Sequence, residues 1–383
     1  MIIHEVKPGE KLSDVAANYG ITEAELRSAN GIKTGEAAVG EELLILVPTR
    51  TYTIQQGDSL ERLCLRFGAR KSELCAMNPD VSFESPHPGD VVSIRHAPKT
   101  HGIAAANGYF YRGCTADKLH RAMPYITYLT VASAVLENGR LTELFDGTQI
   151  AKKAKEHSKT PIIRIYNRAQ PLASHRAPGE LIDSLIEKAK AGGYKGIALG
   201  GELADGEEEL SELLLEIKKQ MIGSDLILIT ECEPDSPPCL SEFSDGSVLS
   251  FYKENLAAFD DAEKRAYANF ATRSEGAKTF IDLPCLATAE GGYIAYDEAL
   301  NLARGGYAIT TDKSSLISYF DHKRRGRITF PSLKNIKATL ELISELGFMG
   351  ISFDIMRTPH SFLAAYNSMY KTVTECSVRQ IDV

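Results

Sequence analysis

The segment Gly193-Tyr194-Lys195-Gly196-Ile197-Ala198-Leu199-Gly200-Gly201-Glu202 is a mostly apolar run that ends in two glycines and an acid. Amphipathic helical patterns lie on both sides of it, at 180–191 and 207–220. A short apolar run between two such patterns is typical of a buried parallel strand. We therefore expect a strand over 194–202 that belongs to a parallel sheet.

The same alternation of strand and helix continues on both sides of this segment. Further helical patterns occur at 260–271 and 332–346. Eight strands alternating with helices predict an α/β fold, a (β/α)8 barrel with a small insertion before its last strand. Active sites of such barrels lie at the carboxyl ends of the strands. The candidate strands are 103–111, 125–132, 161–167, 194–202, 225–231, 247–252, 278–283 and 348–354.

Two copies of a short pattern precede the barrel. Val6-Lys7-Pro8-Gly9-Glu10-Lys11-Leu12 aligns with Ile54-Gln55-Gln56-Gly57-Asp58-Ser59-Leu60, and Asn30 then aligns with Asn78. Each copy predicts a strand, a glycine turn, two short helices and a return strand, with the first helix ending at Gly20 or Gly68. We expect βααβ domains at 1–48 and 51–96, a linker at 97–102 and the barrel at 103–376.

Composition and charge narrow the classes of protein that fit. The 383 residues carry a formal net charge of −8 without a concentrated basic face, so nucleic acid is not an expected partner. No apolar stretch approaches the roughly 20 residues of a membrane span, and the amino terminus lacks the pattern of a secretory signal. The seven cysteines are odd in number and contain no Cys-x-x-Cys pair, which argues against a disulfide framework and a zinc site. Nothing in the sequence specifies an oligomeric state.

The Gly-Asp/Glu-x-Leu opening and the asparagine after the second helix resemble the LysM module, twice in succession. The resemblance implies binding of a glycan that contains N-acetylglucosamine, of peptidoglycan or chitin type, in a groove between two loops. A module kept only for architecture is the alternative. The implied loop residues are Gly9, Glu10, Leu12 and Asn30 in the first copy and Gly57, Asp58, Leu60 and Asn78 in the second.

The barrel segment resembles glycoside hydrolase family 18, close to the LysM-bearing glycosidases that act on spore cortex peptidoglycan. Gly108-Tyr109-Phe110-Tyr111, Asn138-Gly139-Arg140-Leu141 and Leu346-Gly347-Phe348-Met349-Gly350 carry the resemblance, as does the insertion around 293–300. It implies hydrolysis in which the substrate's own acetamido oxygen attacks the anomeric carbon, without a metal or cofactor. The residues that match family positions are Glu202 as acid/base, Tyr252 for acetamido positioning, and Tyr109, Tyr111, Asn167, Phe353 and Asp354 for substrate binding.

The sequence departs from the family where the chemistry should be. Gly200 stands where the family has an aspartate, two residues before the glutamate and on the same face of the strand. Loss of one such electrostatic stabiliser costs about 3 kcal/mol, roughly a hundredfold in rate. Lys253 replaces another acid, and the chain has no tryptophan for a sugar platform.

Two functions therefore stay open. One is a slow N-acetylglucosaminidase that uses Glu202, and the other is a lectin-like or structural protein of the spore coat, cortex or cell wall. Carboxylates near other strand ends, Glu231, Glu233, Asp282 and Asp354, are weaker candidates for the missing group.

Overall fold

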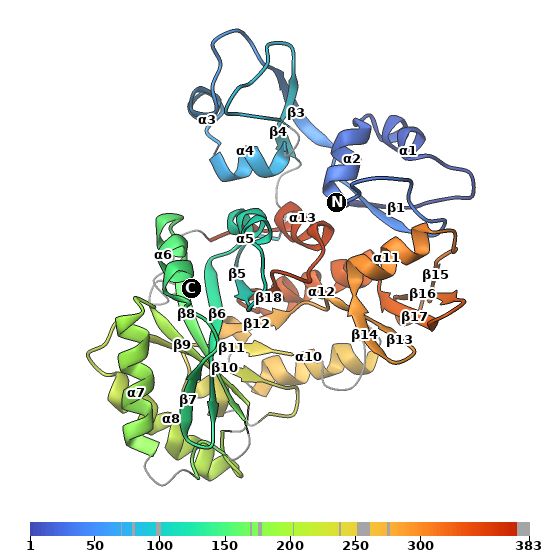
Figure 1. The fold of residues 1–383 in the computed structure, drawn as a ribbon. Coiled ribbons are helices and arrows are strands. Elements are labelled where there is room, and N and C mark those ends of the chain that lie inside the picture. Colours follow the sequence, from blue (N-terminus) through green and yellow to red (C-terminus); the bar gives the residue numbers. More distant parts are fainter. Residues whose placement is uncertain are drawn as a thin grey trace. The chain divides into compact units, whose positions relative to one another are not determined.

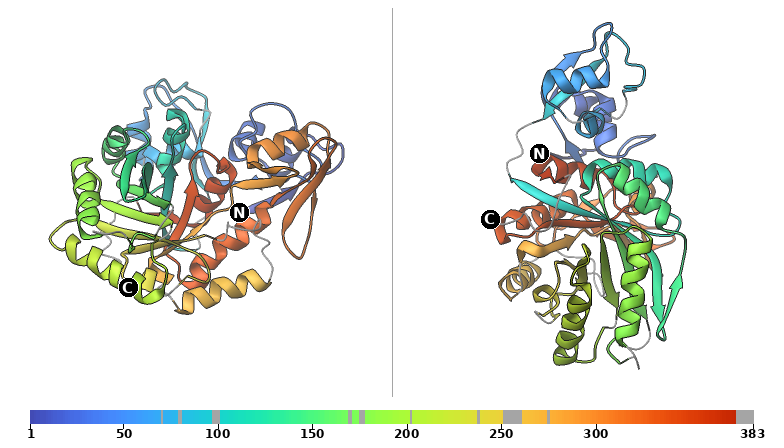
Figure 2. Two further views of the ribbon diagram at one scale, coloured as in Figure 1. Left: turned by 60° about the horizontal axis from the view of Figure 1, so that its bottom comes forward. Right: turned by 90° about the vertical axis from the view of Figure 1, so that its left-hand side faces the viewer.

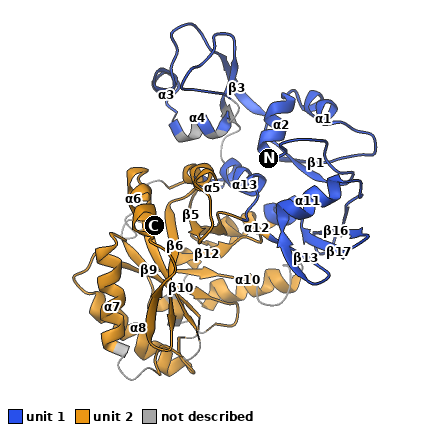
Figure 3. Cartoon of the chain, viewed as in Figure 1, with its two compact units in different colours: residues 1–102, 286–337, 357–371 blue, residues 103–285, 338–356, 372–383 orange. Residues whose placement is uncertain are grey.

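The computed structural model describes residues 1–69, 71–78, 81–96, 101–168, 171–174, 178–201, 203–236, 239–250, 261–273 and 276–373. The chain divides into two compact units, shown in Figure 3. Unit 1 comprises residues 1–102, 286–337 and 357–371, and unit 2 comprises residues 103–285, 338–356 and 372–383.

Unit 2 is a closed barrel of parallel strands (Figure 1). Each strand pairs with the next one round the ring, and closure comes from the pairing of β5 with both β6 and β18. All eight candidate strands are found, so the predicted (β/α)8 fold is confirmed. The barrel strands are β5 (Ile103–Phe110), β6 (Tyr128–Glu137), β8 (Thr160–Arg168), β9 (Gly196–Gly201), β10 (Ile227–Cys232), β11 (Gly246–Leu249), β12 (Thr279–Asp282) and β18 (Gly350–Asp354).

The second barrel strand differs most from its predicted bounds. A 3-10 turn over Met123–Tyr125, with a proline in its first turn, delays the start of β6 to Tyr128. β6 then runs on into a hairpin with β7 (Arg140–Glu143). Asn138 and Gly139 form the turn with φ of 50° and 71°, the two positive values that such a tight hairpin requires.

Helices surround the barrel strands, as Figures 1 and 2 show. The acidic run Glu207-Glu208-Glu209 forms the first turn of α8, where the helix dipole favours negative charge. The helices of the barrel segments are α5 (Ala116–Ala122), α6 (Thr148–Glu156), α7 (Pro178–Ala191), α8 (Glu207–Met221), α9 (Cys239–Glu242), α10 (Asp261–Arg273) and α12 (Leu333–Leu346).

Alternate residues of the strands fill the inside of the barrel. Because side chains alternate in direction along a strand, one inward apolar residue fixes the direction of its neighbours two positions away. The inward set therefore identifies which later residues point into the barrel mouth. Its strand residues are Ala105, Tyr109, Tyr128, Ile162, Ala198, Ile229, Val248 and Phe280, and Met349, which precedes β18, packs against them.

Unit 1 contains the two repeats, and both have the predicted strand–helix–helix–strand order. Gly20 and Gly68 end the first helix of each copy with φ of 67° and 62°, as a glycine cap should. The elements are β1 (Ile2–Glu5), α1 (Leu12–Tyr19), α2 (Glu23–Ala29) and β2 (Glu42–Ile45), then β3 (Pro48–Thr53), α3 (Leu60–Phe67), α4 (Lys71–Met77) and β4 (Val91–His96).

The insertion before the last barrel strand also belongs to unit 1. It forms an antiparallel five-stranded sheet with one helix, and α13 (His360–Met369) completes the unit. Its elements are β13 (Leu286–Ala289), β14 (Gly292–Ala295), α11 (Tyr296–Arg304), β15 (Thr310–Thr311), β16 (Ile317–His322) and β17 (Gly326–Pro331).

The first repeat packs directly against this insertion. Arg304 of α11 holds both carboxylate oxygens of Glu41, at 2.6 and 3.1 Å. The backbone NH of Ile309 donates to the carbonyl of Val39 at 2.8 Å. In the second repeat the residue aligned with Glu41 is Asp90, which is exposed. The two repeats thus share a fold, but the buried position of Glu41 in the first repeat is an exposed one in the second.

Candidate functional site

Tyr109 of β5 and Tyr111, which directly follows β5, line the mouth of the barrel at the carboxyl end of its strands. Tyr109 belongs to the inward-facing core set, and Tyr111 packs against the same set while keeping part of its surface exposed. Their rings stack with centroids 6.0 Å apart and an interplanar angle of 24°. The partly exposed Tyr111 is therefore the member of the pair that can contact a sugar ring.

An ion pair lies across the same mouth. Arg164 of β8 and Glu231 of β10 each follow an inward apolar residue by two positions, so both side chains point inward. The guanidinium binds both carboxylate oxygens, with Nη2 2.6 Å from Oε2 and Nε bonded to Oε1. Tyr109 Oη donates to Oε1 of Glu231 at 3.1 Å. The Arg164 guanidinium also lies 4.8 Å from the centre of the Tyr166 ring, a cation–π contact.

This network fixes the protonation of Tyr109 and Arg164. Burial first, and then the negative charge of Glu231, raise the pKa of the Tyr109 hydroxyl well above its usual value. Burial lowers the pKa of Arg164, but the charge and hydrogen bonds of Glu231 outweigh it, and the net shift is upward. Tyr109 therefore stays a hydrogen-bond donor and Arg164 stays a cation.

The glycine that replaces the family aspartate lies directly beside this ion pair. Gly200 of β9 has the same inward direction as Ala198. A β-carbon built on Gly200 would lie 2.1 Å from Oε2 of Glu231. The space next to position 200 is therefore already filled by a carboxylate from the neighbouring strand.

Two more acids end strands on the far side of the mouth. Asp282 ends β12 and Asp354 ends β18, and both are partly exposed. Burial, and then the charges of Glu231 and Asp354, raise the pKa of Asp282 well above that of an ordinary carboxyl. Ser250 Oγ donates to Asp282 Oδ2 at 3.5 Å. The mouth thus holds two different carboxyls, one whose pKa is raised by its surroundings and one bound by an arginine.

The side chains of two predicted binding residues, Phe353 and Asn167, do not point into this mouth. Ser352 points inward, because its hydroxyl accepts from Asn107 at 3.3 Å and Asn107 lies two residues before the inward-facing Tyr109. Phe353, the next residue, therefore points outward, and it has no exposed surface. Asn167 is 2% exposed and follows the inward-facing Tyr166. As placed, neither side chain offers a surface to a sugar, and both are better assigned to the packing of the strands. Asp354 and the two tyrosines do reach the mouth.

Glu202, Tyr252 and Lys253 lie outside the described residues. Their roles in catalysis therefore stay predictions. The strand that leads to Glu202 ends at Gly201, which has a φ of 88°. A β-carbon at this position would lie 2.0 Å from the carbonyl oxygen of Asn167, so only glycine fits.

Sequence reasoning passed over Arg164 and gave Glu231 little weight. The sequence does indicate both residues, because Arg164 and Glu231 are charged residues at inward positions of otherwise apolar strands, as in Ile162-Ile163-Arg164-Ile165. Opposite charges at such positions on nearby strands predict a pair.

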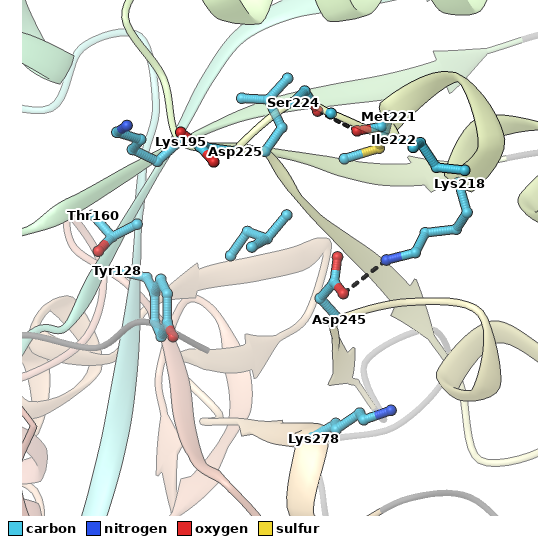
Figure 4. A pocket seen from close by; sticks show the side chains of 13 residues that line it. Tyr128, Thr160, Lys195, Lys218, Met221, Ile222, Ser224, Asp225, Asp245 and Lys278 are labelled. Atoms are coloured by element: carbon cyan, nitrogen blue, oxygen red, sulfur yellow. Dashed lines mark hydrogen bonds and ion pairs between the residues drawn. The ribbon is translucent and has the colours of Figure 1, made fainter. Parts of the chain in front are cut away.

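A cavity of about 810 Å³ opens at the other end of the barrel, among the amino ends of its strands (Figure 4). Lys218 and Asp245 form an ion pair of 2.7 Å across it. Barrel chemistry takes place at the carboxyl ends of strands, so we do not assign the active site to this cavity. Within the described residues no cluster of three metal-binding side chains occurs, and no helix has the length and apolar character to cross a membrane.

The first loop of each repeat is closed in the same way, by an acid at the aligned position. Glu10 accepts the backbone NH of Lys7 at 2.9 Å, and Asp58 accepts that of Gln55 at 2.8 Å. These backbone bonds are the main cause of the lowered pKa of both carboxyls. The turn glycines, Gly9 and Gly57, have φ of 79° and 85° and are exposed.

The second loop of each repeat is anchored by an asparagine. Asn30 Nδ2 donates to the carbonyls of Leu26 and Leu44, and its Oδ1 accepts the NH of Leu44, at 2.7–2.9 Å. Asn78 makes the equivalent three bonds to Leu74 and Ser93, at 2.6–2.9 Å. Both asparagines are buried, as is Leu12. These side chains therefore shape the loops from within, which leaves the loop backbone to contact a glycan.

The fold and these two loops define a class of protein, a (β/α)8 barrel preceded by two LysM domains. A family model, described as "LysM domain", matches residues 4–45 and 52–95. The chain therefore contains two LysM domains, and the predicted resemblance is confirmed.

Solved structures share the rest of the fold. The spore cortex-lytic enzyme SleL of Bacillus megaterium superposes with a TM-score of 0.76 over 98% of this chain and 99% of its own, at 18% identity. A chitinase of Chromobacterium violaceum superposes with a TM-score of 0.62 over 70% of this chain and 98% of its own, at 16% identity. At these identities the likeness establishes the fold, a family 18-like barrel.

A curated relative matches at the level of sequence. It is a Bacillus subtilis protein named "Putative sporulation-specific glycosylase YdhD", 24% identical over 217 residues. The match covers 53% of this chain and 50% of that protein, so the chain spans about half the length of this relative.

Proposed function

We propose that this chain is a glycan-binding protein of the spore or cell wall that attaches to peptidoglycan through its two LysM domains. The observation that carries the proposal is the equivalence of the two loops. Both copies close the first loop with a carboxylate and anchor the second with a buried asparagine, at matching distances. Two separate copies with one loop geometry are expected when that geometry binds the same ligand.

The ligand would lie between these loops. The first loop, at 9–13 or 57–61, presents backbone NH groups around an exposed glycine turn. The second loop is 28–32 in the first domain and 76–80 in the second, where residues 79 and 80 lie outside the described residues. Backbone donors and acceptors on both sides of a groove suit N-acetyl groups, which carry one NH and one carbonyl each.

Tandem domains favour a polymer over a free sugar. When one domain has bound a chain of repeating sugars, the second meets a high local concentration of the same sugars, so the combined affinity exceeds either alone. The relatives named above are a spore cortex-lytic enzyme and a sporulation-specific glycosylase, and these names support peptidoglycan of spore or wall as the polymer.

The proposal is tested by sedimentation of the full chain with insoluble peptidoglycan, cortex and chitin. Asn30→Asp and Asn78→Asp each keep the acceptor oxygen but lose the two Nδ2 donors. We expect each single variant to lower peptidoglycan affinity about tenfold, because avidity is lost, and the double variant to remove it. Lys152→Ala, an exposed change on α6, is the control. Wild type that stays in the supernatant with all three polymers would contradict the proposal.

A second candidate function is slow hydrolysis beside N-acetylglucosamine. The carboxylate of Glu231 beside Gly200, with Asp282 and the tyrosine pair in the same mouth, favours it. In this chemistry the acetamido oxygen bonds to the anomeric carbon while the glycosidic bond breaks. Glu202 gives its proton to the leaving oxygen, and later takes one from the water that opens the oxazolinium ring.

The two candidates are separated by turnover of cortex fragments. Product from wild type and none from Glu202→Gln would establish the glycosidase. Absence of product from wild type, with peptidoglycan binding retained, would leave the barrel as a lectin-like domain.

A further inference from the structure

The strand register brings Glu231 beside the position of the missing aspartate. β9 is paired in parallel with β8 on one side and β10 on the other. Ala198 is the partner of Ile229 in β10, and Gly200 is the partner of Tyr166 in β8. Two residues beyond Ile229 comes Glu231, which therefore lies level with Gly200 and shares its inward direction.

The ion pair crosses β9 at the point where β9 has no side chain. Arg164 comes from β8 and Glu231 from β10, and their bidentate contact passes over the strand between them. A β-carbon at position 200 would meet Oε2 and Cδ of Glu231 at 2.1 and 2.7 Å. The glycine is thus what allows the carboxylate to occupy this place.

From this geometry we propose that Glu231 supplies from β10 the carboxylate that the family aspartate would supply from position 200. Its role is to orient the acetamido group of a bound N-acetylglucosamine unit and to stabilise the positive charge of the oxazolinium. The assignment rests on the proposed binding of N-acetylglucosamine glycans.

Glu231 is well prepared for such a role. Arg164 and Tyr109 bind its two oxygens, and the side chains of Arg164 and Glu231 are 16% and 20% exposed, so the carboxylate is held in one orientation away from bulk solvent. A fixed charge in such a place stabilises a developing cation without having to reorganise. Glu231 neither gains nor loses a proton in the step. The acetamido oxygen forms its bond to the anomeric carbon, the glycosidic bond breaks, and the leaving oxygen takes a proton from the separate acid.

Binding of a charged mimic tests the assignment without requiring turnover. Allosamidin carries an aminooxazoline ring with the positive charge of the oxazolinium, and its affinity for the full chain is measured by calorimetry. We expect Glu231→Gln, which keeps the shape and removes the charge, to weaken allosamidin binding about tenfold or more. Sedimentation with peptidoglycan should stay within about twofold of wild type, because it depends on the LysM domains.

A second pair of variants distinguishes loss of the carboxylate from a general loss of stability. Glu231→Ala frees the space beside Gly200, and Gly200→Asp in that background returns a carboxylate from β9. The double variant should bind allosamidin about fivefold or more tightly than Glu231→Ala alone. Asp245→Asn breaks the ion pair with Lys218 at the opposite end of the barrel and should change the affinity less than about twofold.

Failure of this assignment and failure of glycan binding give different results. Equal allosamidin affinity in wild type and Glu231→Gln overturns the role of Glu231. Wild type that sediments with peptidoglycan but does not bind allosamidin overturns it as well, while the LysM function stands. Wild type that binds allosamidin but no peptidoglycan contradicts the LysM proposal instead.

Discussion

Oε2 of Glu231 lies 2.1 Å from the point where Gly200 would carry a β-carbon. Atoms that are not bonded cannot approach so closely, so a side chain at position 200 and this placement of Glu231 exclude each other. The backbone of Gly200 is not left-handed, whereas that of Gly201 is, with φ of 88°. The two adjacent glycines are therefore required for different reasons. A side chain at Gly200 would overlap Glu231, and the backbone of Gly201 is left-handed.

Gly200→Ala should destabilise the barrel by about 1–3 kcal/mol, the usual cost of overpacking, because Arg164 holds Glu231 in place. The cost should largely disappear in Gly200→Ala/Glu231→Ala relative to Glu231→Ala alone. Urea unfolding of the four proteins gives the coupling free energy.

Gly201→Ala is the matched comparison. Its β-carbon would meet the backbone oxygen of Asn167 at 2.0 Å, so no change of a neighbouring side chain should rescue it. A Gly200→Ala cost that persists in the Glu231→Ala background would show that Glu231 does not cause it.

Glu41→Gln should loosen the first LysM domain from the insertion. The side chains of Arg304 and Glu41 are 13% and 3% exposed, and removing one partner of a buried pair typically costs about 3–5 kcal/mol. Hydrogen exchange in residues 38–45 should rise while the equivalent segment, 87–94, stays unchanged. The exposed pair of Arg325 with Glu298 is the control, since Glu298→Gln should cost about 0–1 kcal/mol. Unchanged exchange in 38–45 would contradict the claim.

The fold was predictable because its signals are local and repeated. Apolar strands such as 194–202 alternate with helical patterns, and the glycines that end the first helix of each repeat need no tertiary information. The predicted start of β6, residue 125, is three residues too early, because the 3-10 turn around Pro124 is as apolar as a strand. That the insertion packs on the first repeat could not be predicted, since it depends on Arg304 and Glu41, which are 263 residues apart.

Residues of the candidate site could be predicted only where they align with functional positions of the family. Tyr109, Tyr111 and Asp354 reach the mouth, but the partnership of Arg164 with Glu231 joins strands across β9 and appears only once the register is known. Phe353 looked like a platform because it is aromatic at a strand end, and alternation from Ser352 turns it outward.

The second LysM domain should favour anionic glycans more than the first. Residues 50–68 carry one net positive charge, while the aligned residues 2–20 carry one net negative charge. Arg62 donates to the carbonyl of Gly57 at 2.7 Å in the first loop, and Arg66 lies 5.0 Å from the centre of the Tyr52 ring. Both arginines are exposed, and Arg66 also donates to Tyr52 Oη, which in turn donates to Asp58 of the first loop.

Arg62→Gln/Arg66→Gln should therefore weaken binding to peptidoglycan, which carries carboxylates, by about tenfold at low salt. Binding to neutral chitin should change less than about twofold. Asp14→Asn, at the position of the first domain aligned with Arg62, is the control and should not reduce peptidoglycan binding. Equal losses for both polymers would show that the arginines support the fold and do not read charge.

Asp282→Asn should stabilise the barrel at neutral pH. The folded protein raises the pKa of Asp282, mainly through burial and then through Glu231 and Asp354, so ionising this carboxyl costs more in the folded state than in the unfolded chain. The stability of wild type should fall as pH rises from the ordinary carboxyl pKa through the raised value. The variant should escape this fall, and its advantage should grow by on the order of 1 kcal/mol per pH unit between those two pKa values. Below the ordinary carboxyl pKa both proteins carry a neutral group here, and the advantage should vanish. Urea unfolding of both proteins between pH 3 and pH 8 measures the difference, and a constant difference across this range would mean that Asp282 does not titrate as its surroundings require.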